Sequence, residues 1–343
     1  MHPRQLRSGI VHVPGQRIAS LGRIPNELSW RPSLQAEPLI HWSEPVREYV
    51  GFAAQFLALG AVGFRFAAVR GRMNSATDPT ERTVYEDASQ RAAVIGLAGI
   101  LVQTLIFLSG LPQAAARAHV AVAQLVTGTL QTGTACVLFA AAIVGLALAA
   151  ARRPAGWPLA LVGAVLAPLT GVFTGQWARL VNPAHRVVAG LWIGTLFILA
   201  VVGLAIVLRE ERTRERRGAI AADMVNGFSP LALTCGMLVV LSGLITAWTH
   251  LNPLSSLWTT PYGYALLIKL CLVAVVFGLG AWNWRRVRPA LGSEDAAHAI
   301  RRSSRAELTA AALVLAATAI LVSLPSPKPA GARPPQPPPS AAP

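Results

Sequence analysis

Charged residues and cysteines are scarce in this chain of 343 residues. Charged side chains make up 13% of the sequence and hydrophobic ones 53%, a ratio of about four hydrophobic residues to one charged residue. In soluble domains this ratio is only about two to one. So little charge excludes a disordered polar chain and argues against a water-soluble globule. The three cysteines, Cys136, Cys235 and Cys271, lie in apolar runs without CxxC or CxxCH spacing. This argues against a disulfide framework, a zinc site and covalently attached haem.

Long apolar runs are the dominant feature of the sequence. Eight of them reach the length of about 20 residues at which a helix spans a bilayer. We therefore expect an all-α, polytopic membrane helix bundle with about eight transmembrane helices. The runs are Tyr49–Val69, Ala92–Leu111, Leu125–Ala151, Trp157–Gln176, His185–Leu208, Phe228–Thr249, Tyr262–Trp284 and Ala306–Leu324.

The apolar runs and their flanks predict four regions. Residues 1–46 form a polar N-terminal tail without the apolar segment of a secretory signal, so we expect the first span to insert directly. Residues 47–181 and 182–324 are two membrane halves of four helices each. Residues 325–343 are rich in Pro and Ala and are expected to be an unfolded tail. Two GxxxG pairs, Gly171/Gly175 and Gly190/Gly194, permit close helix contacts.

Basic residues are distributed unequally between alternate loops. One set of short loops holds three, Arg117, Arg179 and Arg186, and the other holds 17, namely Arg70, Arg72, Arg82, Arg91, Arg152, Arg153, Arg209, Arg212, Arg214, Arg216, Arg217, Arg285, Arg286, Arg288, Arg301, Arg302 and Arg305. Under the positive-inside rule, the arginine-rich loops are cytoplasmic and both termini lie outside. The arginines of the N-terminal tail run against this orientation. We expect a multi-pass protein of the bacterial plasma (inner) membrane that contacts the lipid bilayer and binds no nucleic acid.

Three histidines are expected at the outer ends of spans or in outer loops: His119, His185 and His250. The Asn182-Pro183 pair predicts an N-cap followed by the first helical residue, which places His185 in the first turn of the fifth span. Three imidazoles at one membrane face can form a shallow site for copper. No HxxxH spacing supports such a site, so ordinary polar helix ends remain the alternative.

Charged residues within the spans are the other functional candidates. Lys269 lies roughly 10 Å below the outer boundary of its span, where a charge indicates function or a structural cation that snorkels to the interface. Because it repels metal cations, Lys269 would bind an anionic ligand, order Tyr262 or act in a proton-linked switch. Near the inner end, Asn283 and Glu307 lie at similar depths in adjacent spans, and we expect a hydrogen bond between them.

From Asn182 onward the sequence resembles the copper-resistance D (CopD) family of bacterial inner-membrane proteins. The resemblance covers residues 182–327 and depends on the combination of segments, since each segment alone is weak. The segments are HRVVAGLWIGTLFIL (185–199), FSPLALTCGMLVVLSGLITAW (228–248), TTPYGYALLIKL (259–270), AWNWRR (281–286) and RAELTAAALVLAATAILVSLPSP (305–327).

The resemblance implies an eight-helix protein of copper homeostasis that moves copper ions across the inner membrane. In the family such proteins often lie beside, or are fused to, a periplasmic copper-binding β-sandwich, so copper and a separate periplasmic copper-binding protein are the implied partners. Gln176 stands where the histidine of a Gly-His-Ala motif is expected. The family motif positions that this chain matches are His185, Trp192, Tyr262, Gly263, Lys269, Asn283 and Glu307.

The leading hypothesis is a copper permease for copper uptake or resistance. Its metal site would consist of His185 and His250, with His119 as a further ligand. Its polar path or structural polar residues would be Trp192, Tyr262, Lys269, Asn283, Glu307 and Gln176. The alternatives are a membrane redox, haem or oxidase-assembly protein with axial histidines, and a non-transporting scaffold. No enzyme is expected, because the sequence has no P-loop, GxGxxG unit, nucleophile–base arrangement or carboxylate pair in the spans.

Overall fold

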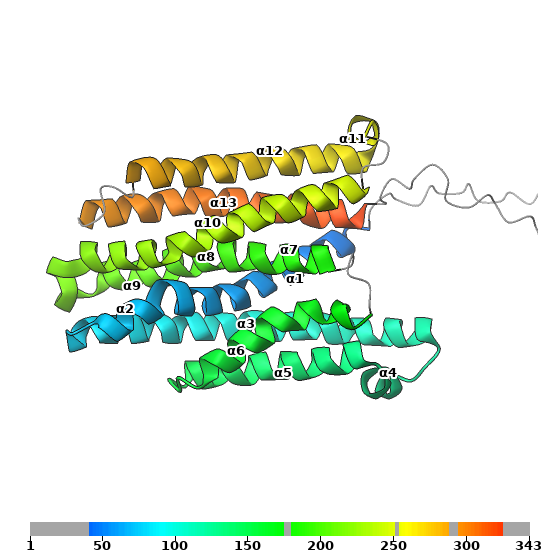
Figure 1. Cartoon of the computed structure of the whole chain (residues 1–343), viewed down its shortest axis with the longest axis horizontal. Coiled ribbons are helices and arrows are strands. Elements are labelled where there is room, and N and C mark those ends of the chain that lie inside the picture. Colours follow the sequence, from blue (N-terminus) through cyan, green and yellow to red (C-terminus); the bar gives the residue numbers. More distant parts are fainter. Residues whose placement is uncertain (1–40, 175–179, 251–253, 288–293, 325–343) are drawn as a thin grey trace, which may run out of the picture. The chain divides into compact units, whose positions relative to one another are not determined.

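The computed structural model describes residues 41–174, 180–250, 254–287 and 294–324, and within these ranges it contains helices and no strands. Eight helical spans there are long and apolar enough to cross a membrane, which confirms the expected all-α membrane bundle (Figure 1). They are, in chain order, Ser43–Ser75, Pro79–Ala118, Leu130–Ala150, Gly156–Phe173, Val181–Arg209, Glu211–Trp248, Pro261–Arg285 and His298–Ser323.

Several spans consist of more than one helical segment. The first contains α1 (Ser43–Gly63), a π-helical turn and α2 (Arg70–Ser75). The fifth contains α7 (Val181–Ala189), the π-helical segment η4 (Gly190–Gly194), α8 (Thr195–Ile198), η5 (Leu199–Gly203) and α9 (Leu204–Arg209). The other long helices are α3 (Pro79–Ala118), α5 (Leu130–Ala150), α6 (Gly156–Leu166), α10 (Arg217–His250), α12 (Pro261–Trp282) and α13 (Glu294–Ser323). Short helices α4 (Val122–Gly128) and α11 (Ser256–Thr259) lie between spans.

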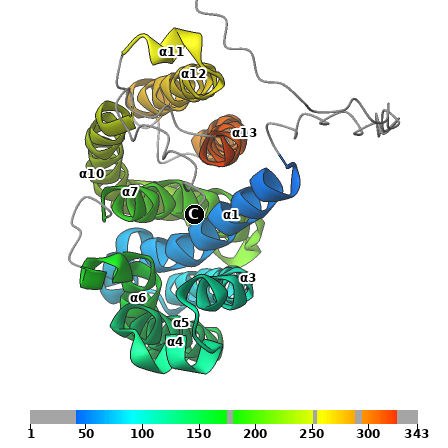
Figure 2. The same ribbon diagram turned by 90° about the vertical axis from the view of Figure 1, so that its right-hand side faces the viewer.

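The first and fifth spans form the centre of the bundle. In each of them 72% of the most apolar stretch of 18 residues is buried, whereas in the other six described spans the buried share of this stretch is between 11% and 39%. Helix α1 packs against α3 on one side and against the fifth span and α13 on the other, as Figure 2 shows. The outer spans expose large apolar side chains such as Leu105, Leu130 and Leu244. Such surfaces suit contact with lipid rather than water.

The two central spans touch backbone to backbone. A Cβ atom at Gly194 would collide with the carbonyl group of Phe56, and one at Gly60 would collide with the backbone of Gly194. The predicted close contact at the Gly190/Gly194 pair is therefore confirmed, because only glycine leaves the space that this crossing requires. The Cβ position of Gly171 meets no atom of another helix within 4 Å, and Gly175 lies outside the described residues.

Two helices begin a few residues away from the positions that the sequence suggests. Helix α1 begins at Ser43, inside the predicted N-terminal tail of residues 1–46, because the helix continues beyond its apolar part. Helix α7 begins at Val181 with Leu180 as the N-cap, so Asn182 lies inside the first turn. There its side-chain oxygen accepts a hydrogen bond of 2.9 Å from Thr246 Oγ1 of α10. The division at residues 181 and 182 and the nature of the two tails stay predictions.

Ion pairs join the polar segments at one end of the bundle. Arg72 pairs with Asp223 at 3.3 Å, Arg152 with Asp87 at 2.7 Å, and Arg216 with Glu81 at 2.8 Å. These contacts bring the ends of the first, second, third and sixth spans together. We refer to this end, defined by Arg72, Arg152, Arg209, Arg216 and Arg301, as the arginine-rich end. The end that carries Asn182 and Pro261 is the opposite end.

Candidate functional site

His185 lies on α7 near the opposite end and faces α10. Its Nδ1 is 2.8 Å from Ser242 Oγ, and Ser242 Oγ also donates a hydrogen bond of 2.6 Å to the Leu238 carbonyl. A serine hydroxyl has one proton, so a hydroxyl that gives it to Leu238 accepts the proton of Nδ1. In the neutral imidazole this leaves the lone pair on Nε2. The hydrogen bond thus fixes the orientation of the ring. Metal-binding histidines are commonly oriented in the same way, by a hydrogen bond to the ring nitrogen that does not bind the metal.

The register of α7 against α10 is antiparallel and continuous. Thr246 contacts Asn182 at 2.9 Å, and Ser242 contacts His185 one turn deeper. A Cβ atom at Gly243 would lie 3.5 Å from Cε1 of His185. Gly243 therefore has no side chain against this edge of the imidazole.

An aromatic pair lies about two turns deeper than His185. The rings of Trp192 in η4 and Phe277 in α12 have centroids 5.0 Å apart and planes at 43°. Gly236 of α10 makes room for this pair, since its Cβ atom would lie 3.3 Å from the Phe277 ring and 3.9 Å from the Trp192 ring. We call Trp192, Phe277 and Gly236 the aromatic floor. It joins the fifth, sixth and seventh spans.

Lys269 lies at about the depth of His185. The fifth and seventh spans run in the same direction, His185 precedes Trp192 by seven residues, and Lys269 precedes Phe277 by eight. An imidazole and a cationic side chain therefore share one level above the aromatic floor.

Asn283 and Glu307 form the hydrogen bond that the sequence predicts. Asn283 Nδ2 donates to Glu307 Oε1, and Ser303 Oγ donates to Asn283 Oδ1. Glu307 is buried, and these bonds satisfy polar groups between the seventh span and α13. We call Asn283, Ser303 and Glu307 the amide clamp. It lies roughly 21 Å along α12 from Lys269, at 1.5 Å per residue, so the predicted polar residues divide into two clusters at different depths.

For the remaining predicted site residues, the structure shows no hydrogen bond to His185 or does not describe the side chain. His119 is exposed and ends α3 in a left-handed conformation with φ of 55°. Tyr262 lies in the first turn of α12 and is half-buried. His250 is the last residue of α10, but its side chain lies outside the described residues, as does Gln176. In the described ranges, no three His, Cys, Asp or Glu side chains come together as a metal site, so the three-histidine site stays a prediction.

The sequence did not assign roles to Ser242, Gly243, Gly236 or Phe277. A signal for the first two was present, because Ser242 and Gly243 belong to the segment that carries the resemblance of α10 to a known family. No comparable signal marks Phe277, which lies in an apolar run of similar residues. Its contact with Trp192 depends on the rotation of α12 about its own axis.

Comparisons with known proteins match the part of the chain that holds these clusters. The model of the family described as "Copper resistance protein D" (CopD) matches residues 222–321. The chain is 32% identical over 143 residues to "Copper transport protein CutJ" of Bacillus subtilis (strain 168), a match that covers 42% of this chain and 24% of that protein. It is 29% identical over 226 residues to "Copper resistance protein D" of Pseudomonas syringae pv. tomato, which covers 59% of this chain and 71% of that protein.

The match to the Bacillus protein therefore spans about a quarter of that relative's length. No solved structure matches the chain significantly.

Proposed function

Since its C-terminal region belongs to the copper resistance protein D family, we propose that this protein carries copper ions across the bacterial inner membrane. Copper binds first at the opposite end, at a site that contains His185. By the distribution of arginine, the opposite end faces the periplasm and the arginine-rich end faces the cytoplasm. The protein acts as a transporter rather than as an enzyme, and copper is its substrate.

The hydrogen bond between His185 and Ser242 is the observation that supports this proposal most. It holds Nδ1 in the donor role and leaves Nε2 as the nitrogen with a lone pair. Neutral imidazole is a common copper ligand. His250 follows Gly243 by two helical turns toward the periplasm, so we assign it to the entrance of the same site. His119 would be a ligand supplied by the other half of the bundle.

Lys269 gives the site a means of releasing its cargo. A copper ion on His185 and a protonated Lys269 at the same depth repel each other, and this repulsion is strong where water is scarce. Copper loading is therefore coupled to movement or deprotonation of Lys269. When the ammonium returns, it lowers the affinity of His185 for copper. A separate periplasmic copper-binding protein would supply the ion.

The proposal is tested by the copper content of cells, measured by elemental mass spectrometry. Cells with the protein, cells without it and cells with the His185→Ala/His250→Ala variant are compared at equal amounts of protein in the membrane. We expect copper content to change on expression and the double variant to abolish the change. A rise indicates uptake and a fall indicates export. His298→Ala is the control, because His298 is exposed in the first part of α13, near the arginine-rich end.

Equal copper content in all these strains would contradict transport. A double variant that behaves like the wild type would contradict the histidine site and leave the family membership unaffected.

A further inference from the structure

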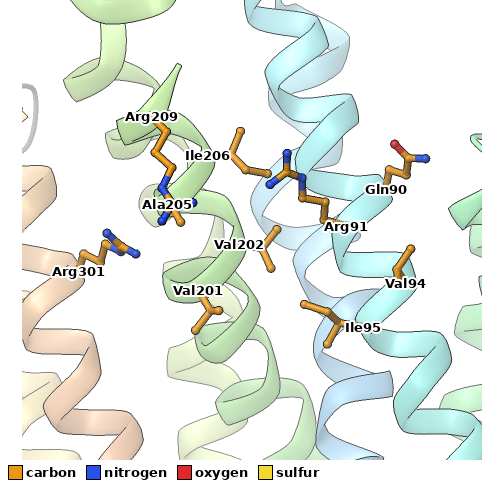
Figure 3. Close-up of a pocket in the computed structure, with 10 residues that line it drawn as sticks. All are labelled: Gln90, Arg91, Val94, Ile95, Val201, Val202, Ala205, Ile206, Arg209 and Arg301. Atoms are coloured by element: carbon orange, nitrogen blue, oxygen red, sulfur yellow. The ribbon is translucent and has the colours of Figure 1, made fainter. Parts of the chain in front are cut away.

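A groove of about 680 Å³ lies on the outward face of the fifth span at the arginine-rich end. Val201, Val202 and Ile206 of the fifth span line its floor. Val94 and Ile95 of α3 line one wall, and Arg301 of α13 lies at the other side (Figure 3). Val94 is 54% exposed and Val201 46% exposed. In a membrane these apolar surfaces would therefore contact acyl chains.

Three arginines from three different spans line this groove: Arg91, Arg209 and Arg301. Figure 3 shows the side chains of Arg91 and Arg301 extending toward the fifth span from opposite sides. The remaining polar lining residue, Gln90, is neutral and donates its amide proton to the Ala150 carbonyl at 3.1 Å. The lining thus has three positive charges and no acidic side chain.

These arginines differ from three others at the same end. Arg72, Arg152 and Arg216 each pair with an acidic side chain. None of the three groove arginines forms an ion pair with any acidic side chain in the described ranges. The positive-inside rule explains why arginines lie at this end, but it does not require three of them to converge without counter-ions beside an apolar groove.

We propose that the groove is a binding site for an anionic phospholipid. The headgroup phosphate binds the guanidinium groups of Arg91, Arg209 and Arg301, and an acyl chain lies along the valines and isoleucines beneath them. Guanidinium groups bind phosphate oxygens through paired hydrogen bonds, and basic pockets between transmembrane helices suit anionic headgroups. The apolar walls favour a lipid over free phosphate, because phosphate alone would leave them without an apolar ligand.

The location of the groove gives the lipid a structural consequence. It would connect α3 and α13 to the end of the fifth span, the same span that carries His185 at its other end. A ligand that binds only the folded protein raises its stability with ligand concentration. The bound lipid would therefore stabilise the packing of the fifth span, whether or not the protein transports copper.

The test uses the purified full-length chain in detergent with phosphatidylglycerol, phosphatidylcholine or inorganic phosphate added. Lipid binding is measured by native mass spectrometry and by the shift in the unfolding temperature. We expect phosphatidylglycerol to bind and to stabilise the protein, and phosphatidylcholine and phosphate to have little effect. The affinity of the Arg91→Gln/Arg209→Gln/Arg301→Gln variant for phosphatidylglycerol should be lower by at least about tenfold. Binding to the wild type should also weaken as the salt concentration rises.

The matched control is Arg153→Gln/Arg285→Gln/Arg302→Gln, which removes the same charge from exposed arginines that do not line the groove. It should bind phosphatidylglycerol like the wild type. A second variant, Val201→Trp, fills the exposed floor, keeps all three arginines and should also weaken binding. Three results would overturn the proposal. They are equal binding of the two lipids, an equal loss of phosphatidylglycerol binding in both triple variants, and stabilisation by phosphate alone.

Discussion

Ser242 of α10 lies 2.8 Å from Nδ1 of His185 on α7, and this contact joins the sixth span to the fifth about two turns above the aromatic floor. The serine hydroxyl is held in turn by the Leu238 carbonyl. A backbone group of one helix thus determines which nitrogen of a histidine on another helix has the free lone pair.

Substitution of Ser242 by alanine removes the acceptor for the Nδ1 proton. We expect copper affinity to fall about 10- to 100-fold, the usual effect of losing an outer partner of a metal-binding histidine. The affinity is measured by competition with a chromophoric chelator. Ser229→Ala is the matched control, because Ser229 lies on the same helix and bonds only the Val225 carbonyl. Equal affinities of wild type and Ser242→Ala would show that the hydrogen bond does not orient a copper ligand.

Substitution of Lys269 by methionine should raise copper affinity and slow copper transport. Methionine has a similar length and no charge, so the repulsion between Lys269 and a cation on His185 is lost; we expect about a tenfold tighter complex. Release of the ion should become slower for the same reason. Equilibrium binding and transport into vesicles are measured on the same preparation. Lys269→Arg keeps the charge and should leave the affinity near that of the wild type. Weaker binding by Lys269→Met would contradict the proposed repulsion.

Substitution of Gly194 by leucine should destabilise the bundle. The new side chain would begin where the Phe56 carbonyl lies, so the first and fifth spans would have to separate. We expect a loss of at least about 1–3 kcal/mol, as for overpacked cores, and a lower unfolding temperature in detergent. Gly278→Leu is the control, because the Cβ position of Gly278 points into open space, with no atom of another helix within 4 Å. A wild-type unfolding temperature for Gly194→Leu would contradict the close crossing.

Two variants of Glu307 in the amide clamp distinguish the contribution of side-chain shape to stability from that of the hydrogen bond. Glu307→Gln keeps an oxygen that accepts from Asn283 Nδ2 and should change stability little. Glu307→Leu leaves the half-buried Asn283 amide without this acceptor, at a cost of about 1–3 kcal/mol. Thermal unfolding measures the difference. Because the clamp lies roughly 21 Å along the seventh span from Lys269, which is at the depth of His185, copper affinity should stay the same in both variants. An altered affinity would place Glu307 in the copper path.

The eight spans, their order and the pair Asn283–Glu307 follow from the sequence alone. A span is a property of about 20 consecutive residues, and the Asn283–Glu307 pair needs only the depths of two residues in adjacent antiparallel spans. The family resemblance also follows from the chain itself, and the comparisons confirm it. Even so, the helix starts at Ser43 and Val181 differ from their predicted positions, because hydropathy does not mark where a helix begins.

The contacts around the two proposed sites depend on tertiary packing. Depth along a span can be counted from the sequence, but the direction in which a side chain points depends on the rotation of its helix and on its neighbours. The hydrogen bond from His185 to Ser242, the contact of Trp192 with Phe277 and the convergence of Arg91, Arg209 and Arg301 all depend on such rotations. Glycines such as Gly194 let two helices cross at close range, and the way the helices pack at such crossings fixes how each is rotated about its own axis.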